Sequence, residues 1–216
     1  MEIKVLKNIL DANNQIAARN RARLDAQRVT ALNIMASPGA GKTTLVVRTV
    51  QGLKEKCRIG VIEGDIASTI DADRVAREGI PVVQINTGGE CHIDANMMST
   101  ALESMDLDKI DLLLLENVGN LVCPAEFDTG SHRKVMLLSV PEGDDKPYKY
   151  PLMFTIADAI IINKIDTLPL FDFNMANFEK AVRGMNPAAR LFPMSLKTGE
   201  GLTEWLAWVE AQARRS

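Results

Sequence analysis

A motif of the phosphate-binding type spans residues 36–44, where the sequence reads A-S-P-G-A-G-K-T-T. Glycine tolerates unusual dihedrals and a helix start leaves its first N–H groups unpaired, so backbone N–H groups here are expected to point at a phosphate chain. Lys42 would reach the β- and γ-phosphates, and the Thr43 hydroxyl would ligate Mg²⁺. The expected phosphate contacts are Pro38, Gly39, Ala40, Gly41, Lys42, Thr43 and Thr44. The chemistry that this pattern supports is binding and hydrolysis of a nucleoside triphosphate.

The position that is usually the first glycine of this motif is Ala36. A methyl group should be tolerated there if the residue keeps ordinary strand-end dihedrals. The alternative interpretation is an ordinary turn between a strand and a helix. The motif, however, follows a strand-length apolar run, Ala31–Met35, and precedes apolar residues at helical spacing, which is the context that a phosphate-binding loop requires.

A second motif, N-K-I-D at residues 163–166, follows another buried apolar run. Asp166 can accept hydrogen bonds from the N1–H and the exocyclic amino group of guanine, whereas adenine offers no such donor pair. Asn163 can bond the base edge and brace the phosphate loop, and the aliphatic stem of Lys164 can lie along the ring face. Turn and capping roles are the alternative for Asn163 and Asp166, but the preceding strand places them on the nucleotide edge.

A third segment, S-L-K at residues 195–197, comes directly after the last expected strand. A backbone N–H of Ser195, Leu196 or Lys197 can meet guanine O6 there. The phosphate motif, N-K-x-D and S-x-K in this order are jointly improbable by chance in a chain of average composition. The sequence therefore predicts GTP and GDP as ligands rather than adenine nucleotides.

Two acidic residues follow buried strands on the same expected edge. Asp65 comes after the run 59–63, and Glu116 comes after the run 110–115. Because the carboxyl ends of parallel strands meet at the nucleotide edge, both are candidates for Mg²⁺ binding, and Asp65 also for orienting the attacking water. The alternative for Asp65 is a cap for a helix that starts near Thr69. The predicted catalytic residues are Lys42, Thr43, Asp65 and Glu116, and the predicted Mg²⁺ ligands are Thr43, Asp65 and Glu116.

Cys91, His92 and Cys123 form a third candidate site. Their two segments follow strands expected to be parallel, so both lie on the nucleotide side of the sheet and could be close together. Two thiolates and an imidazole form a soft ligand set that suits Ni²⁺ or Zn²⁺ better than Mg²⁺. Three ligands close no tetrahedral site, but a two-fold dimer would bring two such triplets together. Ordinary loop cysteines beside a surface histidine remain an open alternative.

The segments that position these residues alternate between strand and helix. Expected strands are residues 31–35, 59–63, 81–86, 110–115, 135–140, 159–162 and 190–193, and expected helices are about 41–56, 71–78, 93–103, 173–184 and a closing helix through Trp205 and Trp208. This alternation predicts an α/β P-loop NTPase fold, with a mostly parallel, doubly wound sheet and helices on both faces. The polar connection 141–147 is expected to be a mobile loop.

An N-terminal amphipathic helix is expected from residue 3 to about residue 26. Its apolar stripe consists of Ile3, Leu6, Leu10, Ala17 and Leu24. The stripe would either pack on the nucleotide domain or recruit a partner protein, and both alternatives remain open. The expected division is an N-terminal helix, residues 1–28, and a P-loop GTPase domain, residues 29–216.

The composition is that of an ordinary globular chain: 216 residues, 46% hydrophobic, 25% charged, with a formal charge of −3. This charge gives no electrostatic basis for binding nucleic acid or a membrane. No secretory signal and no apolar run of membrane-spanning length is found. Three cysteines, an odd number, argue for the reducing cytoplasm and against a disulfide framework. Cys57, at a helix end far from the nucleotide edge, is interpreted as structural.

Longer stretches resemble the HypB family, hydrogenase maturation GTPases that handle nickel and belong to the SIMIBI class of P-loop GTPases. The similarity extends from about Asn33 to the final helix. The matching stretches are A-S-P-G-A-G-K-T-T-L, V-I-E-G-D, D-A-D-R, V-Q-I-N-T-G-G-E-C-H-I-D-A, E-N-V-G-N-L-V-C-P-A-E-F-D, S-V-P-E-G-D-D-K-P-Y-K-Y-P, N-K-I-D-T-L-P and S-L-K-T-G-E-G. E-C-H followed by E-N-V-G-N-L-V-C-P is much more specific than a phosphate loop alone.

The resemblance implies GTP hydrolysis to GDP and phosphate, a homodimer promoted by nucleotide and metal, and Ni²⁺ or Zn²⁺ bound by Cys91, His92 and Cys123 at the dimer interface. It also implies a HypA-type nickel accessory protein and a hydrogenase large-subunit precursor as direct or indirect partners. Lys149 matches a position associated with reaching the other subunit's nucleotide. The histidine-rich tract or cysteine cluster that precedes the GTPase domain in many relatives is not found, which argues against a role in nickel storage.

The sequence thus predicts a GTP-switched metallochaperone for [NiFe]-hydrogenase. Hydrolysis would change metal affinity or geometry, and metal would reciprocally change nucleotide affinity or dimerisation. One alternative is a related urease-type or cobalamin-type maturation GTPase, which the E-C-H and N-L-V-C-P stretches fit poorly. The other is a non-catalytic, GTP-bound metal-binding scaffold.

Overall fold

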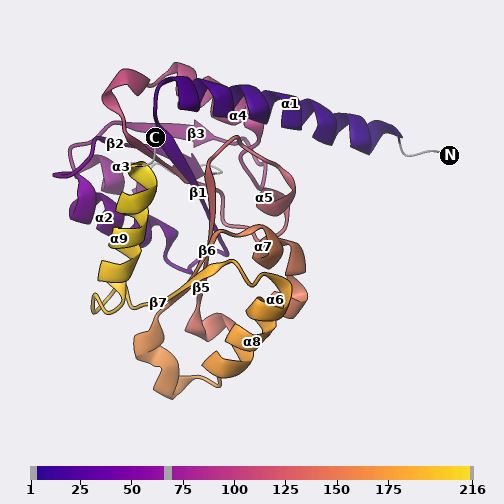
Figure 1. Ribbon diagram of the computed structural model, residues 1–216, viewed down its shortest axis with the longest axis vertical. Helices are drawn as coiled ribbons and strands as arrows, with labels where there is room; N and C mark the ends of the chain where they lie inside the picture. Colours follow the sequence, from indigo (N-terminus) through magenta and orange to yellow (C-terminus); the bar gives the residue numbers. More distant parts are fainter. Residues whose placement is uncertain (1–3, 66–69, 215–216) are drawn as a thin grey trace.

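The computed structural model describes residues 4–65 and 70–214. Within these ranges, seven strands form one sheet in the order β3-β2-β4-β1-β5-β6-β7, and helices cover both of its faces (Figure 1). The strands are β1 (Thr30–Ala36), β2 (Ile59–Asp65), β3 (Val82–Asn86), β4 (Leu112–Glu116), β5 (Arg133–Ser139), β6 (Ala159–Asn163) and β7 (Arg190–Pro193). Every pairing is parallel, so the predicted doubly wound α/β sheet is confirmed.

Helices and short 3-10 segments connect the strands. They are α1 (Lys4–Ala26), α2 (Lys42–Leu53), α3 (Ile70–Ala76), α4 (Ala95–Glu103), η1 (Leu107–Lys109), α5 (Cys123–Glu126), η2 (Val140–Glu142), α6 (Lys146–Lys149), α7 (Pro151–Ile156), η3 (Ile165–Leu170), α8 (Met175–Met185) and α9 (Leu202–Ala213). Helices α2 and α9 pack on one face of the sheet, and α1, α4, α7 and α8 pack on the other. None of these described helices is both long and apolar enough to cross a lipid bilayer.

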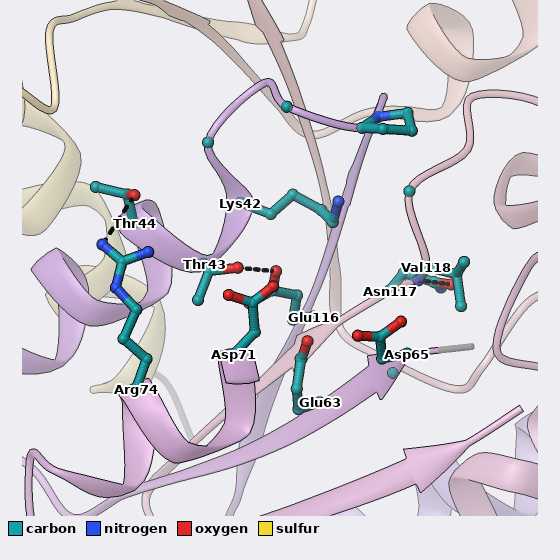
Figure 2. Close-up of a pocket in the computed structure, with 15 residues that line it drawn as sticks. Lys42, Thr43, Thr44, Glu63, Asp65, Asp71, Arg74, Glu116, Asn117 and Val118 are labelled. Atoms are coloured by element: carbon teal, nitrogen blue, oxygen red, sulfur yellow. Dashed lines mark hydrogen bonds between the residues drawn. The ribbon is translucent and has the colours of Figure 1, made fainter. Parts of the chain in front are cut away.

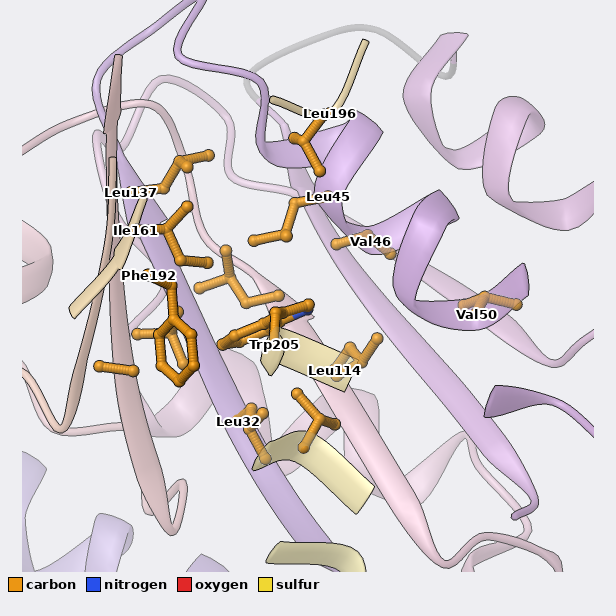
Figure 3. Close-up of a cluster of buried hydrophobic side chains, with 14 of the residues drawn as sticks. Leu32, Leu45, Val46, Val50, Leu114, Leu137, Ile161, Phe192, Leu196 and Trp205 are labelled. Atoms are coloured by element: carbon orange, nitrogen blue, oxygen red, sulfur yellow. The ribbon is translucent and has the colours of Figure 1, made fainter. Parts of the chain in front are cut away.

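Alternating burial explains why the central strands are apolar at nearly every position. In β4, Leu112 and Leu114 join the core beneath α2 and α9, whereas Leu113 and Leu115 join the core beneath α1 and α4. Successive side chains on a strand point to opposite faces, so a strand covered on both sides needs apolar residues throughout. Trp205 of α9 fills the first of these cores (Figure 3).

The strand order decides which loops meet. The carboxyl end of β1 leads into the phosphate loop. Three other strands end in residues of the predicted site: β2 in Asp65, β4 in Glu116 and β6 in Asn163. Because all the strands run in the same direction, these ends lie on one edge of the sheet. β1 lies between β4 and β5, so the chain moves to opposite sides of β1 in the two halves of the fold. Ligands of open α/β sheets bind at such a point.

The apolar stripe predicted for α1 is only part of its buried face. Ala17 and Leu24 of that stripe are buried and Leu10 is half-buried. Ile3 lies outside the described residues, and the structure does not describe the side chain of Leu6. α1 packs along α4, and its N-terminal half extends past the rest of the protein (Figure 1). The division into two domains near residue 28 and the recruitment of a partner by α1 remain predictions.

Two further positions on the buried face of α1 are asparagines. Asn13 and Asn20 are buried together with Ala17 and Leu24, at a spacing that places all four on one side of the helix. Apolar periodicity does not register polar residues on a packed face, so the sequence pattern missed both.

The segment after β5 is more regular than expected. β5 begins at Arg133, earlier than predicted, and residues 140–156 contain η2, α6 and α7. Residues 141–147, expected to be a mobile loop, contain the end of η2 and the start of α6, because prolines stand in the first turn of each of these short helices. In the first turn a missing N–H costs no hydrogen bond, so proline starts a helix there rather than breaking one. Mobility of this segment remains a prediction.

Candidate nucleotide and metal site

The loop between β1 and α2 has the backbone conformation that phosphate binding requires. Gly39 and Gly41 have φ values of 76° and 109°, in the left-handed region that L side chains rarely adopt. A Cβ atom on Gly41 would also lie 2.6 Å from Nδ2 of Asn163. Ala36, the last residue of β1, is not among the described residues with positive φ, so its methyl group is compatible with the loop. α2 begins at Lys42, immediately after the loop.

A pocket of about 420 Å³ opens beside this loop (Figure 2). All four predicted catalytic residues line it, and they come from α2, β2 and β4. The predicted phosphate contacts line it as well, except Ala40, which is buried behind the loop. Their roles in binding or hydrolysis remain predictions, but one pocket contains the residues that those roles need.

Three carboxyl groups converge in this pocket. Oxygen atoms of Glu63, Asp71 and Glu116 lie within 4.8 Å of one another. Glu63 and Glu116 are direct neighbours on β2 and β4, so both side chains point to the same face. The Thr43 hydroxyl donates to Oε1 of Glu116 at 2.8 Å, but Oε2 of Glu116 and Oε2 of Glu63 are buried without a hydrogen-bond partner. Such oxygens are uncommon in folded proteins, and a bound cation would satisfy them.

This arrangement raises the pKa of both glutamates. Burial, followed by the charge of Glu116, raises the pKa of Glu63 to about 9. Burial also raises the pKa of Glu116 to about 7, against the lowering effects of the Thr43 hydrogen bond and the Lys42 charge. Burial and mutual repulsion therefore favour a proton on the Glu63–Glu116 pair, in the place where a divalent cation would supply positive charge. An all-oxygen donor set of this kind fits Mg²⁺.

Glu63 and Asp71 lie in this pocket although sequence reasoning gave neither of them a role there. Glu63 could have been identified from its place in the apolar strand at 59–63, because carboxyl groups are rarely buried in a strand unless they are paired with another group. Asp65 lines the pocket as expected. The alternative in which Asp65 caps a helix near Thr69 concerns residues outside the described ranges.

A second pocket, of about 400 Å³, adjoins the first across the phosphate loop. The residues that line it are Gly39, Gly41, Thr44, Asn163, Lys164, Asp166, Thr167, Leu196 and Lys197. Nδ2 of Asn163 donates to the Ala40 carbonyl at 2.8 Å, and the Lys164 ammonium donates to the Gly39 carbonyl at 2.9 Å. Both side chains therefore brace the phosphate loop, which connects the two pockets mechanically.

The residues predicted to read the base surround Asp166. The Ser195 hydroxyl donates to Oδ1 of Asp166 at 2.6 Å and fixes the carboxylate in place. The Ser195 N–H donates to the Glu200 carbonyl, and the Leu196 N–H donates to the Asn163 side chain. Because the N–H groups of Ser195 and Leu196 already have partners, we expect Lys197 to supply the contact with guanine O6, which remains a prediction.

Lys149, predicted to reach a partner's nucleotide, is paired within its own chain. Its ammonium contacts the Asp145 carboxylate one helical turn away, and both side chains are exposed. The pairing raises the pKa of Lys149 and lowers that of Asp145. Lys149 lines neither of the two pockets, so its role across a dimer remains a prediction.

Cys91, His92 and Cys123 lie together on the same edge. Sγ of Cys91 is 3.0 Å from Sγ of Cys123 and 3.9 Å from Nδ1 of His92, and one ligand atom of each residue lies within 4.8 Å of the others. Metal–ligand bonds of about 2.0–2.3 Å to one ion would span such distances. All three side chains are half-buried, which leaves a side open to further ligands. Hydrogen bonding with Cys91, and then burial, raises the pKa of the Cys123 thiol.

The remaining cysteine and histidine lie elsewhere. Cys57 packs against the core beneath α2 and α9, which agrees with its interpretation as structural. Nε2 of His132 lies 2.9 Å from the Asp25 carboxylate, and Nδ1 of His132 accepts from the N–H of Ala31.

Comparison with known proteins identifies the family. The family model described as CobW/HypB/UreG, nucleotide-binding domain, matches residues 30–193. The hydrogenase maturation factor HypB of Escherichia coli strain K12 is 45% identical over 212 residues, which are 98% of this chain and 72% of that protein. This chain belongs to the HypB family.

Solved structures of HypB proteins have the same fold. The HypB of Archaeoglobus fulgidus matches with a TM-score of 0.88 and 39% identity, over 94% of this chain and 99% of that one. The HypB of Helicobacter pylori, solved in complex with nickel, matches with a TM-score of 0.89 and 38% identity, over 94% and 96% of the two chains. The GDP-bound signal recognition particle receptor FtsY of Elizabethkingia anophelis, at 14% identity and a TM-score of 0.55, shares only the fold. The P-loop NTPase fold is therefore confirmed.

In this HypB-family chain, the segment after β4 connects the two sites. Asn117 lines the phosphate pocket, and its Oδ1 accepts from the N–H of Ile93, next to His92, at 3.0 Å. Its Nδ2 donates to the side chain of Asn33 at 3.1 Å, so the amide is held from both ends. Further along, Nδ2 of Asn120 donates to the Cys91 carbonyl at 3.3 Å. The phosphate pocket and the thiol-bearing segments are thus in direct contact through buried or half-buried amides.

Proposed function

We propose that this HypB-family protein is a GTP-hydrolysing metallochaperone that assists nickel insertion into [NiFe]-hydrogenase through a nucleotide- and metal-dependent dimer. The observation that carries the proposal is the position of Asn117. This residue lines the phosphate pocket and holds the backbone beside His92. A rearrangement at the phosphates can therefore reach the metal segment through one buried amide, which is the kind of shared element that coupling between two sites requires.

Each part of the nucleotide site has a role in the proposed cycle. The loop at 38–44 and Lys42 hold the triphosphate, and Lys42 stabilises charge that develops on the phosphates. Asp166 selects guanine, and Asp65 orients the attacking water. The residues that would hold Mg²⁺ directly or through water are Thr43, Asp65, Glu116 and Glu63. When bound, Mg²⁺ supplies positive charge against the β- and γ-phosphates.

Nickel is the proposed cargo of Cys91, His92 and Cys123, with Zn²⁺ as the alternative ion. Thiolates and an imidazole suit both metals. Three ligands leave a tetrahedral site incomplete, and a second copy related by a two-fold axis would add ligands from its own triplet. The nickel complex of the Helicobacter pylori HypB supports nickel as the cargo.

The proposed partners follow from the family. They are a HypA-type nickel accessory protein and the hydrogenase large-subunit precursor, reached directly or indirectly. The cytoplasm is the expected compartment, and the free thiols of Cys57, Cys91 and Cys123 suit reducing conditions.

The experiment that tests this function combines phosphate release with sedimentation. We expect multiple turnovers of GTP, lost in Lys42→Ala, and a dimer with a non-hydrolysable GTP analogue and Ni²⁺ but not with GDP alone. Phosphate release that never exceeds one equivalent per chain would favour the non-catalytic scaffold instead. A monomer under every condition would contradict the dimer.

A further inference from the structure

Helix α1 contacts both segments that carry the proposed metal ligands. The helix lies outside residues 30–193, which match the shared nucleotide-binding domain, so its contacts are additional to that domain. Its packed face contains Asn13 and Asn20, which are only 7% and 3% exposed. Buried amides need hydrogen-bond partners, and when satisfied they specify one arrangement of the groups around them.

Each asparagine joins both segments to the same helix. Oδ1 of Asn13 accepts from the Ala95 N–H at 2.9 Å, and its Nδ2 donates to the Asp128 carbonyl at 2.9 Å. Nδ2 of Asn20 donates to the Ala95 carbonyl at 2.7 Å and to the Thr129 carbonyl at 3.1 Å. These bonds hold the backbone at residue 95 and the backbone at 128–129 against one rigid element.

The residues held in this way are close in sequence to the metal ligands. Ala95 is the first residue of α4 and shortly follows His92. The backbone at 128–129 comes just after α5, whose first residue is Cys123. Phe127 lies in the chain between α5 and residues 128–129, and its ring packs against that of His92 with centroids 4.1 Å apart. Fixing the two backbones therefore fixes the spacing between the His92 and Cys123 segments.

The approach of the second segment to α1 is close. A Cβ atom on Gly130 would lie 2.5 Å from the Ala17 carbonyl and 2.8 Å from Cβ of Asn20. The Arg21 guanidinium donates to the Gly130 carbonyl at 2.6 Å and also contacts the Ser131 carbonyl. The loop after α5 thus rests directly on the helix, and it would lose several backbone partners if the helix moved away.

We propose that α1 is a positioning element of the metal site and that Asn13 and Asn20 are its positioning residues. The inference rests on the metal-binding role proposed above for the Cys91, His92 and Cys123 triplet. Neither asparagine touches the ion. Both keep the ligand segments in register before metal enters, so that less ordering is required on binding. Groups hydrogen-bonded directly to metal ligands typically change metal affinity by about 10–100-fold, and the two asparagines act one step further out, so we expect the lower end of this range.

The test measures Ni²⁺ affinity of the full chain without nucleotide, by titration with Ni²⁺ alone and by the thiolate-to-nickel absorption band. Asn13→Ala and Asn20→Ala should each weaken Ni²⁺ binding by about 10-fold and alter the band. GDP affinity should stay within about twofold of the parent, because neither residue lines a nucleotide pocket. Asn14→Ala is the matched control, since Asn14 is the next residue on the same helix and is exposed.

A second variant tests the contact with Asp128 separately. Asn13→Asp keeps an acceptor for the Ala95 N–H but replaces the donor to the Asp128 carbonyl by a carboxylate oxygen that repels it, so it should weaken Ni²⁺ binding at least as much as Asn13→Ala. Ni²⁺ affinities equal to that of Asn14→Ala would overturn the inference. Parallel losses of Ni²⁺ affinity, GDP affinity and melting temperature would also overturn it, as general destabilisation. A parent protein that binds no Ni²⁺ through Cys91, His92 and Cys123 would overturn the proposed function together with this inference.

Discussion

The phosphate pocket and the Cys-His triplet lie on the same edge of the sheet but are built in opposite ways. The pocket concentrates buried charge: Glu63 and Glu116 are 3% and 2% exposed, and each has an oxygen without a hydrogen-bond partner. The triplet is half-buried, and the two thiols already contact each other at 3.0 Å. One site is electrostatically unfavourable until a cation arrives, whereas the other contains no buried carboxyl group and is partly open toward solvent.

This difference indicates what each site needs from outside the chain. The phosphate pocket is lined by all four predicted catalytic residues within one chain, and what it lacks is a nucleotide and a cation. The proposed metal triplet lacks ligands for a closed tetrahedral site, so under this proposal it depends on a second copy or a partner. Because the Asn117 amide touches both regions, a nucleotide that changes the first can change the affinity of the second, by a free energy that acts equally in both directions.

The largest effect is expected when the triplet loses a ligand. Cys123→Ala should weaken Ni²⁺ binding by at least about 100-fold, about 2.7 kcal/mol, while GTP affinity changes by less than about twofold. Titrations with Ni²⁺ and with labelled nucleotide measure the two affinities, and Cys57→Ala is the control because Cys57 packs in the core beneath α2 and α9. If Cys123→Ala bound Ni²⁺ as tightly as the parent, the triplet would not be the metal site.

A smaller effect, confined to the other region, is expected from Asp166→Asn. Replacing an acceptor by an amide donor opposite the guanine N1–H and amino group should weaken GTP binding by about 10–100-fold and favour xanthine nucleotides. Competition of GTP and XTP against a labelled nucleotide gives both values. Asp172→Asn, at an exposed position shortly downstream, should leave both unchanged. Parental GTP affinity in Asp166→Asn would remove Asp166 from base recognition.

The smallest effect is a gain in stability when buried charge is removed. The folded-state pKa of Glu63 is raised from 4.5 to about 9, first by burial and then by the charge of Glu116. The folded protein therefore favours the protonated carboxyl group, and its free energy of unfolding falls as the pH rises from about 4.5 toward 9. Gln carries no such penalty. Without nucleotide and Mg²⁺, Glu63→Gln should melt close to the parent at pH 5 and about 5 °C higher at pH 8. This difference corresponds to about 1–3 kcal/mol of unfolding free energy, since 1 kcal/mol shifts the Tm of a domain of this size by about 2–4 °C.

Calorimetric melts of Glu63→Gln across this pH range test the comparison between the two regions. Glu55→Gln, at an exposed position, is the control and should follow the parent. A Tm difference that does not change with pH would show that the acidic pocket carries no electrostatic cost in the absence of a cation.

The parts of this edge that follow strand ends could be predicted from sequence. Asp65, Glu116 and Asn163 each end or follow a buried run, and a parallel sheet necessarily brings such ends together. Cys91 follows β3 and Cys123 begins α5 after β4, so topology places both residues on this edge. Their contact at 3.0 Å was not predictable in this way, because β2 lies between β3 and β4 in the sheet.

Other parts depend on contacts that no local pattern encodes. The pairing of Glu63 with Glu116 arises from the register of β2 and β4, which are distant in sequence. Asn13 and Asn20 look like solvent-facing residues in an amphipathic pattern, yet their partners are backbone groups of loops around residues 95 and 128. The short helices after β5 could not be predicted from sequence either, because their prolines suggest turns unless the helix start is known.

The proposed function requires that nucleotide state and metal affinity are coupled through the shared edge of the sheet. The coupling is measured as the Ni²⁺ dissociation constant of the full chain with Mg²⁺ and saturating GDP, and again with a non-hydrolysable GTP analogue. We expect at least about a fivefold difference in the Ni²⁺ dissociation constant between the two states, and an equal Ni²⁺-induced change in the ratio of the two nucleotide affinities. The same Ni²⁺ dissociation constant in both nucleotide states would contradict it.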